Sequence, residues 1–217
     1  MNDSLHVLED LNDVFTTLYA ELGVCREELQ RDHASQYRRR LLIREFCTFV
    51  EVVAYHFKRL SLYITQKMIP DIRAAGHVTN KDEVLSPFMD TLSPSEVMLL
   101  EERSPVLDDS GAASSRRMFP RTAPNIHFAF STYLKVVKTG VHVDFAGPGW
   151  RSMEATIEVR NRLTHPKRRN DLTVSDENLA ALVTANDWLL KARNDMMSAA
   201  NRVLERTAEL TTRPKQP

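Results

Sequence analysis

Apolar residues recur at steps of three and four along much of the chain, which is the spacing of one face of an amphipathic helix. A first helix is expected from about Leu5 to Gly23, where the glycine is expected to stop it. A longer helix is expected from about Ser35 to Pro70 or Gly76. Its apolar stripe consists of Leu41, Leu42, Phe46, Phe49, Val50, Val53, Phe57, Leu60 and Ile64.

The second half of the chain contains three more helical patterns, over about residues 124–140, 150–165 and 175–211. The last of them begins with Ser175 and Asn178, a capping-box spacing in which asparagine replaces the usual glutamate or glutamine. Between the first two, residues 141–145 alternate between apolar and polar side chains, and this alternation predicts a very short strand.

The segment from about residue 70 to 124 has a different composition and contains six of the ten prolines. Its run from Asp108 to Ser115 has no apolar residue larger than alanine, which is typical of a loop. Within the segment, Ser93 followed by Pro94 predicts the start of a short helix, with serine as the N-cap. We therefore expect an all-α bundle in a single domain over residues 1–212, with a loop-rich insertion and a frayed tail at 213–217.

Composition narrows the possible partners. Lysine plus arginine equals aspartate plus glutamate at 29 each, so the formal net charge is zero and any anion binding must be local. Cys25 and Cys47 have neither zinc-site spacing nor the density of a disulfide scaffold, and we expect them to pack as small apolar residues. No signal peptide and no apolar run of about 18 residues is visible, so a cytoplasmic protein without a membrane partner is expected.

One segment combines several groups capable of chemistry. Pro166 disfavours helical geometry at His165, so a helix should end there, with Asn161 one turn back. Five cations and no carboxylate lie between residues 160 and 170, namely Arg160, Arg162, Lys167, Arg168 and Arg169. Arginine suits a phosphate and histidine titrates near neutrality, so the segment could hold or cut a phosphodiester. Dipole compensation and capping at a helix C-terminus explain the same residues without any ligand.

Other candidate sites are weaker. His127, His142 and His165 with Asp144 do not complete a ligand set, and no metal or cofactor is expected. The cluster Arg38–Arg40 with Arg44 is either a solvated helix face or a set of contacts to an RNA backbone.

The sequence from Arg160 to Lys167 resembles the signature of the HEPN superfamily, in which an arginine, usually followed by a polar residue, is separated from a histidine by four to six intervening residues. Here four residues lie between Arg160 and His165, and the polar residue is Asn161. The similarity extends upstream to Gly149-Trp150 and downstream over residues 172–179, and a preceding helix at 46–51 is of the kind that these proteins carry.

This resemblance implies a bundle of four to five antiparallel core helices that dimerises around two copies of the motif. It also implies a metal-independent endoribonuclease of toxin or phage-defence type, with a possible antitoxin or defence-system partner. Carried over to this chain, Arg160 would contact the scissile phosphate, Asn161 would position groups, and His165 would take the proton of the ribose 2′-hydroxyl. Arg162, Lys167, Arg168 and Arg169 are expected to bind RNA. The alternative is a non-catalytic interaction module or a nucleotide- or RNA-binding regulatory module.

Overall fold

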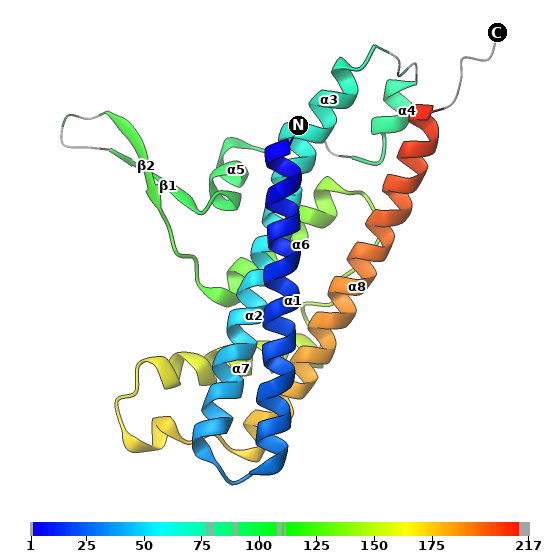
Figure 1. Cartoon of the computed structure of the whole chain (residues 1–217). Helices are drawn as coiled ribbons and strands as arrows, with labels where there is room; N and C mark the ends of the chain where they lie inside the picture. Colours follow the sequence, from blue (N-terminus) through cyan, green and yellow to red (C-terminus); the bar gives the residue numbers. More distant parts are fainter. Residues whose placement is uncertain are drawn as a thin grey trace. The chain divides into compact units, whose positions relative to one another are not determined.

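The computed structural model describes residues 2–76, 78, 80–88, 91–107, 110 and 112–212. The protein is mostly helical, with 74% of the described residues in helices and 6% in strands, which confirms the prediction of a helical protein (Figure 1). The predicted frayed tail at 213–217 lies outside the described residues. Among the described residues, no helix is both long enough and apolar enough to cross a membrane.

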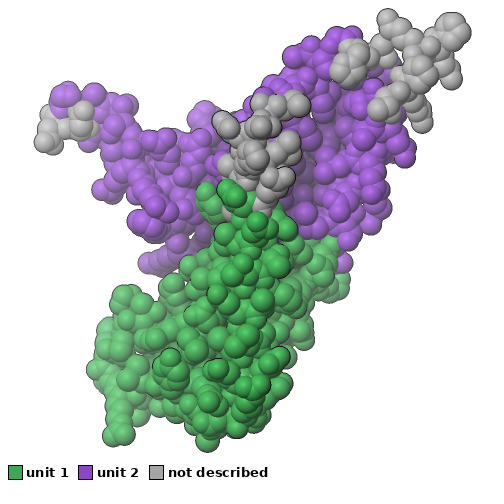
Figure 2. Space-filling model, in the orientation of Figure 1, with its two compact units in different colours: residues 1–56, 142–194 green, residues 57–141, 195–217 purple. Residues whose placement is uncertain are grey.

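The chain divides into two compact units, which Figure 2 distinguishes by colour. Unit 1 comprises residues 1–56 and 142–194, and unit 2 comprises residues 57–141 and 195–217. The helices α2 (Gln36–Tyr63) and α8 (Asp176–Thr212) contribute residues to both units. The single domain over residues 1–212 stays a prediction.

Unit 1 consists of α1 (Asn2–Arg31), the first part of α2, α7 (Pro148–Thr164), the short 3₁₀ helix η2 (Arg169–Leu172) and the first part of α8. The predicted stop at Gly23 is wrong, because α1 continues to Arg31 and buries Leu29. One glycine inside a helix costs only about 1 kcal/mol relative to alanine, which the burial of the following turn offsets. The core of unit 1 includes Leu22, Ile43, Phe46, Phe49, Val50, Met153, Leu163, Leu182 and Leu189.

The N-terminus of α7 is packed closely against α8. Trp150 is 6% exposed and its ring lies 5.2 Å from that of Trp188, so Trp150 belongs to the core. A Cβ on Gly149 would lie 2.6 Å from the Cβ of Trp188, so only glycine fits here. Trp188 donates its indole N–H to the carbonyl of Asp144 at 3.0 Å.

The predicted strand at residues 141–145 is wrong, because these residues form no strand. Val143 is buried between the exposed residues His142 and Asp144. The alternation of apolar and polar residues therefore reflects the burial of one side chain, and these residues pair with no neighbouring strand. Asp144 instead accepts hydrogen bonds through Oδ1 from the backbone N–H groups of Ala146 and Gly147, which shapes the turn before α7.

Unit 2 begins with the end of α2, continued by a π-helical turn, η1 (Ile64–Met68), and by α3 (Ile69–Ala74). The helical path therefore reaches Ala74, between the two ends predicted for it, at Pro70 and Gly76. The unit also contains α4 (Lys81–Leu85), α5 (Pro94–Leu100), α6 (Thr122–Val136) and the last part of α8. The core around α2 and α6 includes Phe57, Ile126, Ala129, Phe130, Tyr133 and Val136.

The insertion at 70–124 contains more regular structure than expected. The helix α5 begins as predicted, with a capping box in which the Ser93 hydroxyl accepts from the Glu96 N–H and the Glu96 carboxylate accepts from the Ser93 N–H. The segment also contains an antiparallel hairpin, β1 (Arg103–Leu107) and β2 (Ala113–Arg117), where a loop was predicted. Of the Asp108–Ser115 run, residues 108, 109 and 111 lie outside the described part of the chain.

Candidate functional site

The motif residues lie at the C-terminus of α7 in unit 1. The helix ends at Thr164, and His165 is its C-cap, with its backbone N–H donating to the carbonyl of Asn161 at 3.1 Å. The predicted helix end beside His165 and Pro166 is confirmed. The side chains of Asn161 and His165 belong to exposed residues, so both are accessible to a ligand.

Arg160 is held from two sides. Its Nη2 atom lies 3.2 Å from Oε1 of Glu51 on α2, and its Nη1 atom lies 3.4 Å from Oδ1 of Asn161. The Arg160 side chain is 33% exposed and that of Glu51 is 42% exposed, so this ion pair lies at the surface. Glu51 lies within the 46–51 segment of the resemblance, yet the sequence pattern assigned it no role. Only the packing of α2 against α7 pairs its carboxylate with Arg160.

Cys47 lies one helical turn before Glu51 and is 1% exposed. Burial raises the pKa of its thiol to about 12, opposed by the positive charge of Arg160 and assisted by the negative charge of Glu51. The thiol is therefore protonated at neutral pH and is not a nucleophile. Cys47 packs as a small apolar residue, as its position in the helical pattern predicted.

The segment after α7 presents cationic side chains. The side chains of Lys167, Arg168 and Arg169 belong to exposed residues. The carboxylate of Asp171 accepts hydrogen bonds from the backbone N–H groups of Lys167 at 2.7 Å and Arg168 at 2.8 Å, and these bonds hold the pKa of Asp171 below its usual range. Because these two N–H groups are already bonded, an anion at this segment would be bound by side chains.

Arg162 is placed differently from the other cations of the motif. Its Nη1 atom donates to three backbone carbonyls, those of Asn170, Asp171 and Thr173, at 3.0 to 3.1 Å. Its Nη2 atom lies 3.5 Å from Oδ1 of Asn178 in the first turn of α8. Arg162 thus fastens the 170–173 segment to α7, and its contact with RNA stays a prediction.

The arginines at the start of α2 bind backbone carbonyls too. Arg38 donates to Glu28 at 2.9 Å, Arg40 to Leu172 at 3.0 Å, and Arg44 to Leu163 at 3.2 Å. Arg39 donates to the carbonyls of His33 and Val174 and lies 2.7 Å from the Asp176 carboxylate. Through these bonds the four arginines connect α2 to α1, to α7 and to the start of α8. Arg44 is also exposed, and a contact of this cluster with an RNA backbone stays a prediction.

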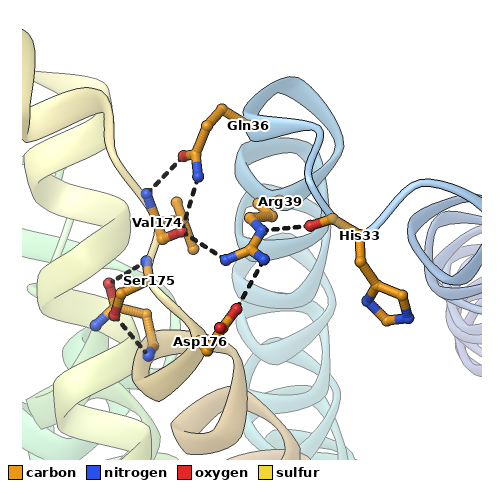
Figure 3. A network of polar contacts seen from close by, with 7 residues as sticks. His33, Gln36, Arg39, Val174, Ser175 and Asp176 are labelled. Carbon is orange, nitrogen blue, oxygen red and sulfur yellow. Dashed lines mark hydrogen bonds and ion pairs between the residues drawn. The ribbon is translucent and has the colours of Figure 1, made fainter.

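Figure 3 shows the centre of this network. Gln36 accepts from the backbone N–H of Val174 at 2.8 Å and donates to its carbonyl at 3.1 Å. Arg39 reaches the same carbonyl and also Asp176 (Figure 3). The Ser175 and Asn178 capping predicted for α8 is present, since each side chain accepts from the backbone N–H of the other residue. The network therefore fixes the segment that follows the motif.

The division of roles among these cations defines the candidate site. Arg39, Arg40, Arg44 and Arg162 are occupied by backbone carbonyls. Arg160 is paired with a carboxylate at the surface, beside the exposed Asn161. Exposed His165 and the cations at 167–169 complete a positively charged end of α7 on a chain of zero net charge.

The histidines considered as metal ligands are not brought together in a ligand set. Within the part of the chain that the structure describes, no group of three or more histidine, cysteine, aspartate or glutamate side chains is arranged to hold a metal ion. His142 and His165 belong to unit 1 and His127 to unit 2.

Comparisons of the chain with protein-family models, with curated proteins and with solved structures found no match.

Proposed function

We propose that the C-terminal end of α7 is the site of a HEPN-like, metal-independent endoribonuclease. The observation that carries the proposal is the placement of Arg160, Asn161 and His165 on one accessible helix end, while the neighbouring arginines are engaged with backbone carbonyls. Exposed Lys167, Arg168 and Arg169 add positive charge beside them, as RNA phosphates require.

In the proposed reaction, His165 accepts the proton of a ribose 2′-hydroxyl and the 2′-oxygen attacks the adjacent phosphorus. Arg160 exchanges its bond to Glu51 for the phosphate and stabilises the negative charge that develops on the phosphate oxygens. Asn161 orients Arg160 through its side-chain oxygen. The bond to the 5′-oxygen breaks, this oxygen takes a proton from water, and the hydroxide that remains takes the proton held by His165. The products are a 2′,3′-cyclic phosphate and a 5′-hydroxyl.

The resemblance adds a biological setting to this proposal. It points to a homodimer in which two copies of the motif share a cleft, and to a toxin or phage-defence role with RNA as the substrate. It also points to an antitoxin or defence-system partner, and to action in the cytoplasm.

The deciding experiment is cleavage of purified total RNA and tRNA in EDTA by the wild-type protein. Arg160→Ala and His165→Ala are expected to lose activity by at least about 100-fold, the usual minimum for a general base or a charge-stabilising group. His33→Ala is the matched control, because His33 is an exposed histidine of the same unit whose side chain lies outside the motif. All variants should first show equal thermal melting and equal oligomeric state.

Loss of cleavage in the two motif variants alone, with cyclic-phosphate ends in the wild-type products, would support the proposal. An inactive wild type, or equal cleavage by all four proteins, would refute it.

A second candidate is a non-catalytic interaction module or a nucleotide- or RNA-binding regulatory module. The ion pair between Arg160 and Glu51 favours it, because a bound phosphate must displace a carboxylate that already occupies the arginine. Such a module would bind RNA or a nucleotide in an Arg160-dependent way without cleaving it, and overexpression would not slow the growth of a host.

A further inference from the structure

The hairpin of unit 2 carries a dense group of arginines. β1 and β2 pair as an antiparallel hairpin (Figure 1). In its register Arg103 lies opposite Arg117 and Ser104 opposite Arg116. Residues directly opposite each other in an antiparallel pair have their side chains on the same face, with Cα atoms about 5 Å apart. Arg103 and Arg117 are therefore like charges side by side on one face of the ribbon.

Such a pair of like charges destabilises a ribbon unless an anion lies near. All three hairpin arginines belong to exposed residues, and none is paired with a carboxylate in the portion of the chain that the structure describes. Glu102, which directly precedes β1, is bound by Lys58, whose Nζ atom lies 3.3 Å from Oε1. Among the described residues, no carboxylate neutralises the positive charge of the hairpin, which can therefore attract an anionic ligand.

An exposed aromatic ring adjoins this charge. Phe119 is 79% exposed, and the guanidinium carbon of Arg117 lies 5.1 Å from the centre of its ring. An exposed aromatic ring with a guanidinium group beside it can bind an unpaired base, because a base stacks on an aromatic ring and on a planar guanidinium. Phosphate-binding arginines beside a stacking ring are the chemistry that recognises single-stranded nucleic acid.

The base of the hairpin is held firmly. Glu102 adopts a left-handed backbone conformation with φ of 56°, and its carbonyl accepts a hydrogen bond from the N–H of Met118 at 2.7 Å, which extends the ladder. The Lys58 side chain that binds Glu102 is fully buried. Arg103 and Arg117 are adjacent in sequence to Glu102 and Met118, and Phe119 follows Met118. These side chains are therefore held in place before a ligand binds, which lowers the entropic cost of binding.

We propose that Arg103, Arg117 and Phe119, here called the hairpin surface, bind single-stranded RNA. Arg103 and Arg117 bind phosphates of the strand, and Phe119 stacks on a base. The choice of RNA rests on the proposed function, since a ribonuclease or an RNA-binding module has that ligand. The surface belongs to unit 2, so it is a binding site separate in sequence from the motif of unit 1.

The test is the affinity of the full-length chain for a fluorescent 12-nucleotide oligouridylate, measured by anisotropy at several salt concentrations. His165→Ala is the background, so that the RNA stays intact. Adding Arg103→Ala and Arg117→Ala should weaken binding about 10- to 100-fold and lower the salt slope by about 1.4, the value for two phosphates of a single strand. Adding Phe119→Ala should weaken binding about 10-fold and leave the salt slope unchanged.

The matched control is Arg202→Ala with Arg206→Ala, which removes two exposed arginines of α8 from the same unit. Affinity lost in the hairpin variants and retained in the control supports the proposal. Equal affinity in all variants overturns it, and so does tighter hairpin-dependent binding of an oligoglutamate peptide, which would assign the surface to an acidic protein.

The two proposals fail separately. RNA binding that depends on the hairpin, by a wild type that does not cleave, refutes the ribonuclease only. Cleavage that depends on His165, by a chain whose hairpin variants bind RNA normally, refutes the hairpin surface only.

Discussion

Arg160 of α7 and Glu51 of α2 form an ion pair with 3.2 Å between Nη2 and Oε1, at a point where both side chains remain partly accessible. The carboxylate therefore both positions the guanidinium and competes with any phosphate that approaches it. An exposed ion pair contributes little to folding stability, about 0 to 1 kcal/mol, so a role in ligand binding can be tested without unfolding the protein.

Replacing Glu51 with glutamine should change RNA affinity more than stability. We expect Glu51→Gln to bind the oligouridylate several-fold more tightly in the His165→Ala background, because the guanidinium loses its competing negative charge. The free energy of unfolding should change by less than about 1 kcal/mol. Anisotropy and a denaturant melt measure the two effects. Weaker RNA binding would show instead that Glu51 chiefly positions Arg160.

Removing Arg162 should loosen the segment between α7 and α8. Arg162→Ala deletes three hydrogen bonds to backbone carbonyls, and we expect a loss of about 1 to 3 kcal/mol in unfolding free energy. Backbone amides at 167–175 should exchange faster in hydrogen–deuterium exchange. Arg169→Ala is the control, since Arg169 is an exposed arginine of the same segment, and its effect should stay within about 0.5 kcal/mol. Equal effects of the two variants would contradict the role assigned to Arg162.

The ion pair between the buried Lys58 and the partly buried Glu102 should contribute to the stability of unit 2. Glu102→Gln leaves the ammonium of Lys58 buried without a counter-charge and should destabilise the protein by about 3 to 5 kcal/mol. The double variant with Lys58→Met should recover most of this loss, because an apolar side chain of similar length fills the same space. Chemical denaturation of the three proteins measures the effect, and a double variant as unstable as Glu102→Gln would count against it.

The same pair predicts a pH dependence with a definite sign. Burial lowers the pKa of Lys58 below its usual value of 10.5, more strongly than Glu102 raises it. The unfolded chain therefore binds more protons than the folded chain between the folded pKa and 10.5, so the contribution of Lys58 to stability rises with pH in this window. Lys58→Met should lack this rise, which denaturant melts at increasing pH would show by comparison with the wild type.

Two glycine substitutions should have opposite effects. Gly149→Ala places a Cβ 2.6 Å from that of Trp188 and should destabilise unit 1 by about 1 to 3 kcal/mol through overpacking. Gly23→Ala lies inside α1 with no heavy atom within 4 Å of the added Cβ, and should stabilise the protein by about 0.5 to 1 kcal/mol. Thermal melting compares the two, and a destabilising Gly23→Ala would contradict the placement of this glycine within a continuous helix.

The helices could be predicted from the sequence wherever local interactions decide them. Apolar periodicity predicted α2, α6, α7 and α8, and Pro166 after His165 predicted the end of α7. The expected end of α6 near residue 140 is wrong, because α6 ends at Val136. The capping of α5 by Ser93 and Glu96 was predictable for the same reason, because both partners lie within one helical turn. The prediction that Gly23 ends α1 is wrong because the cost of one glycine in a helix is small compared with the stabilisation from burying Leu29. The local sequence pattern does not show which residues become buried.

The sequence predicted that the motif residues share one helix end, and it did not predict the partners of the charged side chains around them. Arg160, Asn161 and His165 are neighbours on one helix, so sequence spacing alone determined that they share a helix end. The sequence does not show which group a basic side chain will bind. Tertiary packing places backbone carbonyls within reach of Arg40, Arg44 and Arg162, and it places the Glu51 carboxylate beside Arg160. The hairpin also depends on tertiary structure, because the backbone N–H and C=O groups of β1 form hydrogen bonds with those of β2. This pairing is set by the register across the turn, and neither strand has a periodic pattern that predicts it.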